Sequence, residues 1–83
     1  MKIIQPVLFA VLSRFPKHKD SAKRLFKESE EFQTTCEDFG SCVKALDHWN
    51  QSKEEIAVER RAEYSAIIQE LEEEILQQLN ESG

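Results

Sequence analysis

The chain has little of what catalytic or metal-binding proteins usually need. Its 83 residues include two glycines, two prolines, two cysteines and two histidines. The scarcity of glycine and proline argues against a sheet protein, and no glycine-rich turn is present that could build an oxyanion site. Neither a Glu-x-x-His pair nor a His-Glu-x-x-His motif occurs. We therefore expect no catalytic residue, no cofactor and no metal, and a protein that is not an enzyme.

The two cysteines do not predict a disulfide. On one helix, Cys36 and Cys42 would be separated by about 9 Å of rise and would point in different directions. A disulfide needs Cα atoms within about 7 Å of each other. Neither cysteine has a histidine within one helical turn that could act as a base. Free thiols fit a reducing compartment, so we expect a cytoplasmic protein.

Long hydrophobic runs are also missing. The apolar stretch from Ile3 to Leu12 is interrupted by Gln5 and Pro6, and no small-residue cleavage site follows it before Arg14. A membrane-spanning helix needs about 20 apolar residues. The sequence thus predicts a soluble protein, for which the expected membrane role is limited to a peripheral contact through the N-terminal helix.

What the chain does contain is a continuous heptad pattern. Large residues recur every seven positions at Leu25, Phe32, Phe39 and Leu46. Small residues recur with the same period at Ala22, Ser29, Cys36 and Val43, and the two series interleave in steps of three and four. This pattern is typical of a helix that packs along its whole length, and it predicts an all-α fold.

Three helical segments follow from the pattern and from its stop signals, at residues 5–15, 17–49 and 53–80. Pro6 suits the first turn of the first helix, and Pro16 ends it. Ser52 and Glu55 form a predicted capping box that starts the third. A break of the middle helix near Thr34–Gly40, giving four helices, is the alternative, because Gly40 costs about 1 kcal/mol in a helix interior.

The two long helices should form an antiparallel hairpin, and the short first helix should pack across it, within one domain of residues 1–83. Pairing outward from the turn predicts that Leu46 lies near Ile56, Cys36 near Ser65 and Lys27 near Glu74. The expected core seam consists of Leu25, Phe32, Cys36, Phe39, Val43, Leu46, Tyr64, Ile68, Leu71 and Ile75.

Charge is unevenly distributed along the chain. Residues 1–27 contain seven Lys or Arg and one acidic residue, whereas residues 28–83 contain four basic and fifteen acidic residues. One interpretation is that the basic start of the second helix lies beside the acidic end of the third within the hairpin. The other is that segment 1–27 binds nucleic acid or an anionic membrane surface. Nucleic acid is disfavoured, because the segment lacks interleaved exposed aromatic residues.

The function that we expect is a non-enzymatic interaction or scaffold module that associates with itself. The first helix and the wide apolar stripe of the third offer more apolar surface than a thin hairpin can cover. The expected partner is a second copy of the chain or another helical protein, and the candidate interface residues are Phe26, Trp49, Val7, Val11 and Leu12. The alternative function is a peripheral binder of anionic surfaces through the basic amphipathic segment 1–27.

The sequence also resembles a group of short bacterial all-helical proteins of unassigned function. The resemblance rests on Ser13–Pro16, Phe32, Cys36–Phe39, Cys42, Ala45–Leu46, Trp49, Glu63–Tyr64, Leu71–Glu72 and Glu74–Ile75. Phe39 occupies the position where that pattern has tyrosine. The resemblance implies a bacterial, cytoplasmic, all-helical protein, and it implies no activity and no cofactor.

Overall fold

The computed structural model describes residues 6–82 and contains only helices in this range. Residues 1–5 lie outside the described residues, and with them Lys2 of the basic segment and Gln5, the predicted first residue of the first helix. The elements are α1 (Pro6–Arg14), a 3-10 turn η1 (Pro16–His18), α2 (Lys19–Glu28), α3 (Glu30–Gln51) and α4 (Ala57–Ser82). The predicted all-α fold is confirmed.

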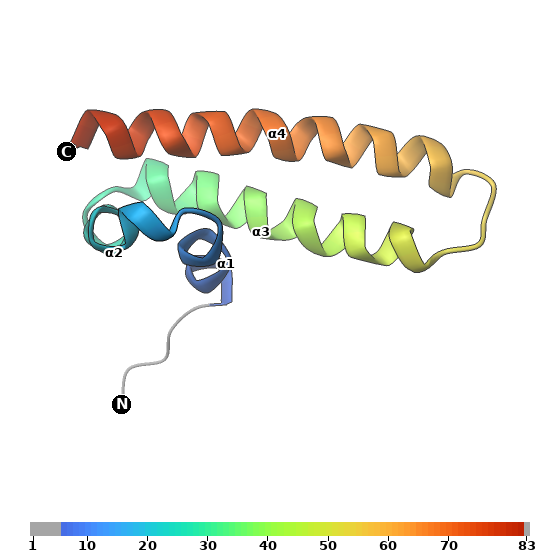
Figure 1. Ribbon diagram of the computed structural model, residues 1–83, viewed down its shortest axis with the longest axis horizontal. Coiled ribbons are helices and arrows are strands. Elements are labelled where there is room, and N and C mark those ends of the chain that lie inside the picture. Colours follow the sequence, from blue (N-terminus) through green and yellow to red (C-terminus); the bar gives the residue numbers. More distant parts are fainter. Residues whose placement is uncertain (1–5, 83) are drawn as a thin grey trace.

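The two longest helices, α3 and α4, pack side by side as an antiparallel hairpin (Figure 1). The short helices α1 and α2 lie against one end of this hairpin, the end where α4 finishes. The other end, near the connecting loop of residues 52–56, consists of α3 and α4 alone. The prediction of a hairpin with a short N-terminal helix packed on it is confirmed.

The middle helix is not continuous over residues 17–49, and that prediction was wrong. The break lies at Ser29, which has extended backbone angles (φ −123°, ψ 115°). The Ser29 hydroxyl accepts a hydrogen bond from the backbone N–H of Phe32 at 3.1 Å, so that Ser29 caps the start of α3. The backbone N–H of Ser29 itself donates to the carbonyl of Leu25, at the end of α2.

The alternative break near Thr34–Gly40 was also misplaced, because α3 runs through this segment. The Thr35 hydroxyl bonds back to the carbonyl of Glu31 at 3.0 Å. Gly40 is buried where α1 crosses α3, and a Cβ atom built at Gly40 would collide with Cγ2 of Val7. Glycine is therefore used here for a close approach of two helices rather than as a helix terminator.

The register of the hairpin differs from the prediction. Gln78 donates a hydrogen bond to the Thr35 hydroxyl at 3.3 Å, and Arg61 donates one to the carbonyl of Trp49 at 3.2 Å. In the predicted register Thr35 and Trp49 would have faced residues 66 and 53, which lie 12 and 8 positions earlier. One cause is that α3 extends to Gln51 and α4 begins only at Ala57.

Ser52 and Glu55 do not form the predicted capping box, because the third helix does not start at Lys53. Ser52 instead follows the end of α3, where its N–H donates to the carbonyl of Trp49 at 3.2 Å. Its hydroxyl accepts from the N–H of Glu54, also at 3.2 Å. Ser52 thus stabilises the loop, and α4 begins five residues later at Ala57, which is buried.

The core forms largely along the predicted seam. Phe32, Cys36, Phe39, Ile68 and Ile75 are buried, and the remaining seam residues are partly buried: Leu25, Val43, Leu46, Leu71 and Tyr64. Val11, Leu12, Ala22 and Leu79 complete the buried cluster. Residues from all four helices therefore share one core, which holds α1 and α2 against the hairpin.

Candidate functional site

The two thiols are poorly suited to chemistry. Burial, followed by the charge of Glu37, raises the pKa of Cys36 to about 12. Burial and then Asp38 raise the pKa of Cys42 as well. Because the thiolate is the reactive form, both side chains are weak nucleophiles and weak metal ligands at neutral pH.

Within residues 6–82, no three His, Cys, Asp or Glu side chains are grouped to hold a metal ion. In the same range, every buried side-chain nitrogen or oxygen has a hydrogen-bond partner. None of the described helices combines the length and the apolar character needed to cross a membrane.

The predicted interface residues fall into two groups. Val11 and Leu12 are buried inside the single chain, so assigning them to an interface was incorrect. Val7 and Phe26 are partly buried and pack against the core. Trp49 is also partly buried, and its ring makes an edge contact with His48 at a centroid distance of 4.9 Å. Of the five, Trp49 lies farthest from the packed end of the molecule.

The side of α3 that carries Trp49 is turned away from α1. Gly40 faces Val7 of α1. Each residue turns an α-helix by about 100°, so Cys42, two positions on, points to roughly the opposite side of α3. Leu46 and Trp49 follow Cys42 at four and seven positions and share that side. All three are partly buried.

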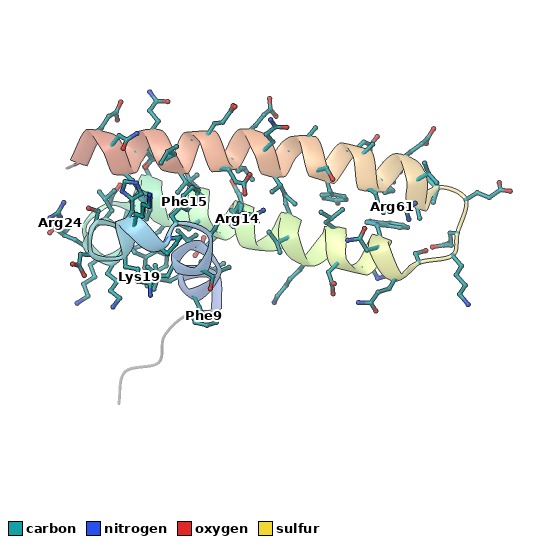
Figure 2. The ribbon with its side chains drawn as sticks, in the orientation of Figure 1. Phe9, Arg14, Phe15, Lys19, Arg24 and Arg61 are labelled. Carbon is teal, nitrogen blue, oxygen red and sulfur yellow. The ribbon has the colours of Figure 1, made fainter. Side chains whose placement is uncertain are left out.

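The same side of the hairpin can be located on α4. Arg14, at the end of α1 (Figure 2), forms an ion pair with Glu72, so Glu72 lies on the side of α4 that faces α1. Ile67, five positions earlier, is rotated by about 140° from Glu72 and is 40% exposed. Tyr64 and Leu71 lie one turn on either side of Ile67 and are partly buried.

These six residues form one surface, which we call the back face: Cys42, Leu46, Trp49, Tyr64, Ile67 and Leu71. The hydrogen bond from Arg61 to Trp49 shows that the two sets lie at similar heights along the hairpin. Part of this face packs within the chain: Thr35, seven positions before Cys42, accepts a hydrogen bond from Gln78 of α4, and Cys42, Leu46 and Leu71 pack against the core. Ile67 is the exposed residue of the back face. Sequence reasoning assigned four of the six to the core seam or to a partner interface but did not identify Cys42 or Ile67 as part of this surface.

The rim of the back face is mainly acidic. Asp38 lies one turn before Cys42 on α3, and Glu63 and Glu70 lie about one turn on either side of Ile67 on α4. All three carboxylates are exposed. Arg60 joins the rim, where it is held by Glu63 in an exposed ion pair of 2.8 Å. A partly buried apolar strip, with Ile67 as its exposed residue, thus has an acidic border along the hairpin.

A second surface lies where α1, η1 and α2 meet. A hollow of about 440 Å³ is lined by Phe9, Leu12, Ser13, Pro16, Lys19 and Lys23, and we call it the basic hollow. Phe9 is 64% exposed and projects from α1 on the side away from α4 (Figure 2). Sequence reasoning missed Phe9, although an aromatic residue outside the apolar face of a helix was a usable signal.

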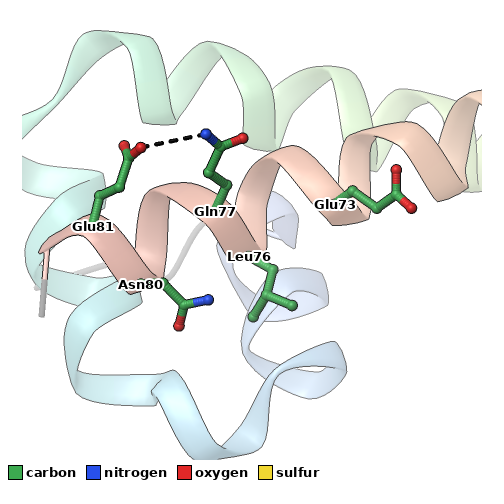
Figure 3. A pocket seen from close by; sticks show the side chains of 5 residues that line it. All are labelled: Glu73, Leu76, Gln77, Asn80 and Glu81. Carbon is green, nitrogen blue, oxygen red and sulfur yellow. Dashed lines mark hydrogen bonds between the residues drawn. The ribbon is translucent and has the colours of Figure 1, made fainter.

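A third surface lies on the outside of α4 near its end. Figure 3 shows Glu73, Leu76, Gln77, Asn80 and Glu81 around a shallow hollow of about 410 Å³, and we call this surface the acidic ridge. Gln77 donates a hydrogen bond to Glu81 at 3.3 Å. Leu76 is 39% exposed and is the large apolar residue of the ridge.

Comparisons with known proteins identify no relative of this chain. No protein-family model matches the chain, and neither a curated protein nor a solved structure matches it significantly. The resemblance to short bacterial helical proteins therefore stays a prediction.

Proposed function

We propose that the protein is a non-enzymatic helical module that associates with itself through the back face. Two hairpins that pack by these faces would form a four-helix bundle, with α1 and α2 of each copy on the outside. The observation that carries this proposal is the side chain of Ile67 on α4, which is 40% exposed and has the partly buried Tyr64 and Leu71 one turn away on either side.

The two-helix end of the molecule supports the same proposal. A hairpin of two helices has one thin apolar seam, whereas bundles of four helices enclose a core on all sides. At this end Leu46, Trp49 and Tyr64 are only partly buried. Packing against a second hairpin would remove their remaining apolar surface from water, which stabilises the assembly by about 25 cal/mol per Å².

The acidic rim determines how salt should affect the dimer. Exposed Asp38, Glu63 and Glu70 of the two copies would lie near each other at the edge of the contact. Their repulsion opposes association at low ionic strength, and salt screens it. A dimer through the back face should therefore become tighter as salt is added, unlike a contact between opposite charges.

The free thiols bear on where this module works. Cys36 and Cys42 are both free in the structure. Proteins that keep unpaired cysteines suit reducing compartments, and we therefore propose a cytoplasmic location.

A charge placed in the back face tests the proposal. We expect Ile67→Glu to turn the dimer into a monomer in sedimentation equilibrium at high salt, because each copy would bury an unpaired carboxylate in the contact. The matched control is Val58→Glu. Val58 is on the same helix and is 64% exposed. It lies fourteen positions before Glu72, which is close to four full turns, so the two side chains point in similar directions, away from that of Ile67.

The control variant should keep the wild-type dimer. Loss of the dimer in both variants would show a general effect of added negative charge and would contradict the proposal. So would a wild-type protein that is monomeric at every concentration, in which case the back face would have to serve a different partner. Circular dichroism would establish that both variants remain helical.

A further inference from the structure

We infer that the basic hollow is a second contact site, whose occupant is the acidic ridge on α4 of another copy of this chain. The inference extends the proposed self-association but uses different surfaces, so that either can fail alone. It accounts for Phe9, Lys19 and Lys23, which the back face does not use.

The hollow is shaped to take a side chain and charged to take an acidic one. It is lined by Leu12, which is buried, and by Phe9, which is 64% exposed. Lys19 and Lys23 are exposed and lie one turn apart on α2, so that both can face one ligand. An apolar pocket with cations beside it suits an apolar side chain flanked by carboxylates.

The acidic ridge has these features. Leu76 is its large apolar residue and is partly exposed, while Glu73 and Glu81 lie on either side of it along α4. Figure 3 shows these side chains spread over one face of the helix. Leu76 would enter the hollow beside Phe9, and the two glutamates would approach Lys19 and Lys23.

The ridge of the same chain does not fill the hollow. Phe9 points away from α4 and remains exposed within the single molecule (Figure 2). A flat lipid surface would neutralise the lysines but would not fill a concave site. A second copy supplies the charge and the shape together, and for this reason we assign it as the occupant.

Charge exchange between the two surfaces tests the inference. All proteins in this experiment carry Ile67→Glu, so that association through the back face is disabled. At low salt, the parent should self-associate, and Lys19→Glu with Lys23→Glu should weaken this association by at least about tenfold, because like charges across an interface repel. Glu73→Lys with Glu81→Lys should weaken it equally. Each of the two charge-exchanged proteins, measured alone, is expected to be monomeric at concentrations where the parent associates.

An equimolar mixture of the two charge-exchanged proteins should associate again, since an acidic hollow then meets a basic ridge and a basic hollow meets an acidic ridge. Failure of the mixture to associate, with both proteins still helical, would overturn the inference. Association that is unchanged by either exchange would overturn it too. The proposed dimer through the back face is measured separately, in proteins that retain Ile67.

Two further measurements locate the contact. A zero-length carbodiimide cross-linker, applied to a mixture of light and heavy-isotope chains, should join Lys19 or Lys23 of one copy to Glu73 or Glu81 of another. Vesicles containing phosphatidylglycerol provide the competing occupant. Binding to these vesicles that depends on Lys19 and Lys23, without intermolecular cross-links to the ridge, would assign the hollow to a membrane surface and overturn the inference.

Discussion

Val7 of α1 lies directly against Gly40 of α3, at the point where the two helices cross. A Cβ at Gly40 would collide with Cγ2 of Val7, and would lie 3.6 Å from the Val7 Cβ and 3.7 Å from its Cα. Both the side chain and the backbone of α1 are thus close to the glycine. The contact fixes how near α1 comes to the hairpin, and α1 in turn carries Phe9 and one wall of the basic hollow.

This contact predicts an unusual result for Gly40→Ala. Such a change in a helix interior normally stabilises by about 1 kcal/mol. Here we expect a net destabilisation of about 1–2 kcal/mol, because the stiff β-branched side chain of Val7 must shift. Urea unfolding at a fixed protein concentration would measure it. In a Val7→Ala background the same change should become neutral or stabilising, and an identical effect in both backgrounds would contradict the contact.

The cap at Ser29 predicts a second effect. Ser29→Ala removes the hydrogen bond to the N–H of Phe32 and should lower the free energy of unfolding by about 1 kcal/mol, whereas Ser29→Asp should retain most of it. Ser41→Ala is the control, because Ser41 is exposed in the middle of the same helix. Thermal unfolding would compare the three. A loss in Ser41→Ala equal to that in Ser29→Ala would argue against a capping role.

The buried thiol of Cys36 predicts a loss of stability in alkaline solution. Burial and Glu37 raise its pKa from 9.0 to about 12. Above pH 9 the thiol ionises in the unfolded chain but stays protonated in the folded protein, so the unfolded state binds fewer protons and unfolding becomes easier. The contribution of the Cys36 thiol to the free energy of unfolding is therefore complete below pH 9 and decreases between pH 9 and 12. The stability difference between wild type and Cys36→Ala should therefore shrink over this range, and a constant difference would contradict the assignment.

Cys42 offers a native probe of the back face. It is partly exposed in the single chain, whereas Cys36 is buried. In the folded protein we expect a thiol reagent such as DTNB to modify Cys42 and to spare Cys36. Modification of Cys42 should slow as protein concentration rises, because the proposed dimer covers it. In the Ile67→Glu variant the rate should not depend on concentration, and concentration dependence there would point to a different contact.

Much of the fold was predictable because helical periodicity is a local property of the chain. The heptads that include Phe32, Phe39 and Ile75 identify the core of the hairpin from the amino-acid sequence alone. The break at Ser29 was not predictable from this pattern, because the phase of the heptads is the same on both sides of it. The cap itself was a visible signal: a serine followed by Glu30 and Glu31 is a typical helix start.

The register and the surfaces were harder to predict. They depend on contacts between distant segments, such as the one between Thr35 and Gln78, for which sequence spacing gives no direct signal. Gly40 was interpreted through its intrinsic cost in a helix, but packing against Val7 outweighs that cost. Val11 and Leu12 were assigned to an interface because their apolar face exceeded what a thin hairpin seemed to need. The structure shows that this face closes the core of the chain itself.

The most direct measurement of the central claim is molar mass in solution by light scattering, over a concentration series at low and high ionic strength. The chain has a mass of 9.7 kDa. We predict a species of about twice that mass in high salt, where the acidic rims of the two back faces are screened. A mass that stays at the value of a single chain, at every concentration and in high salt, would contradict self-association through the back face.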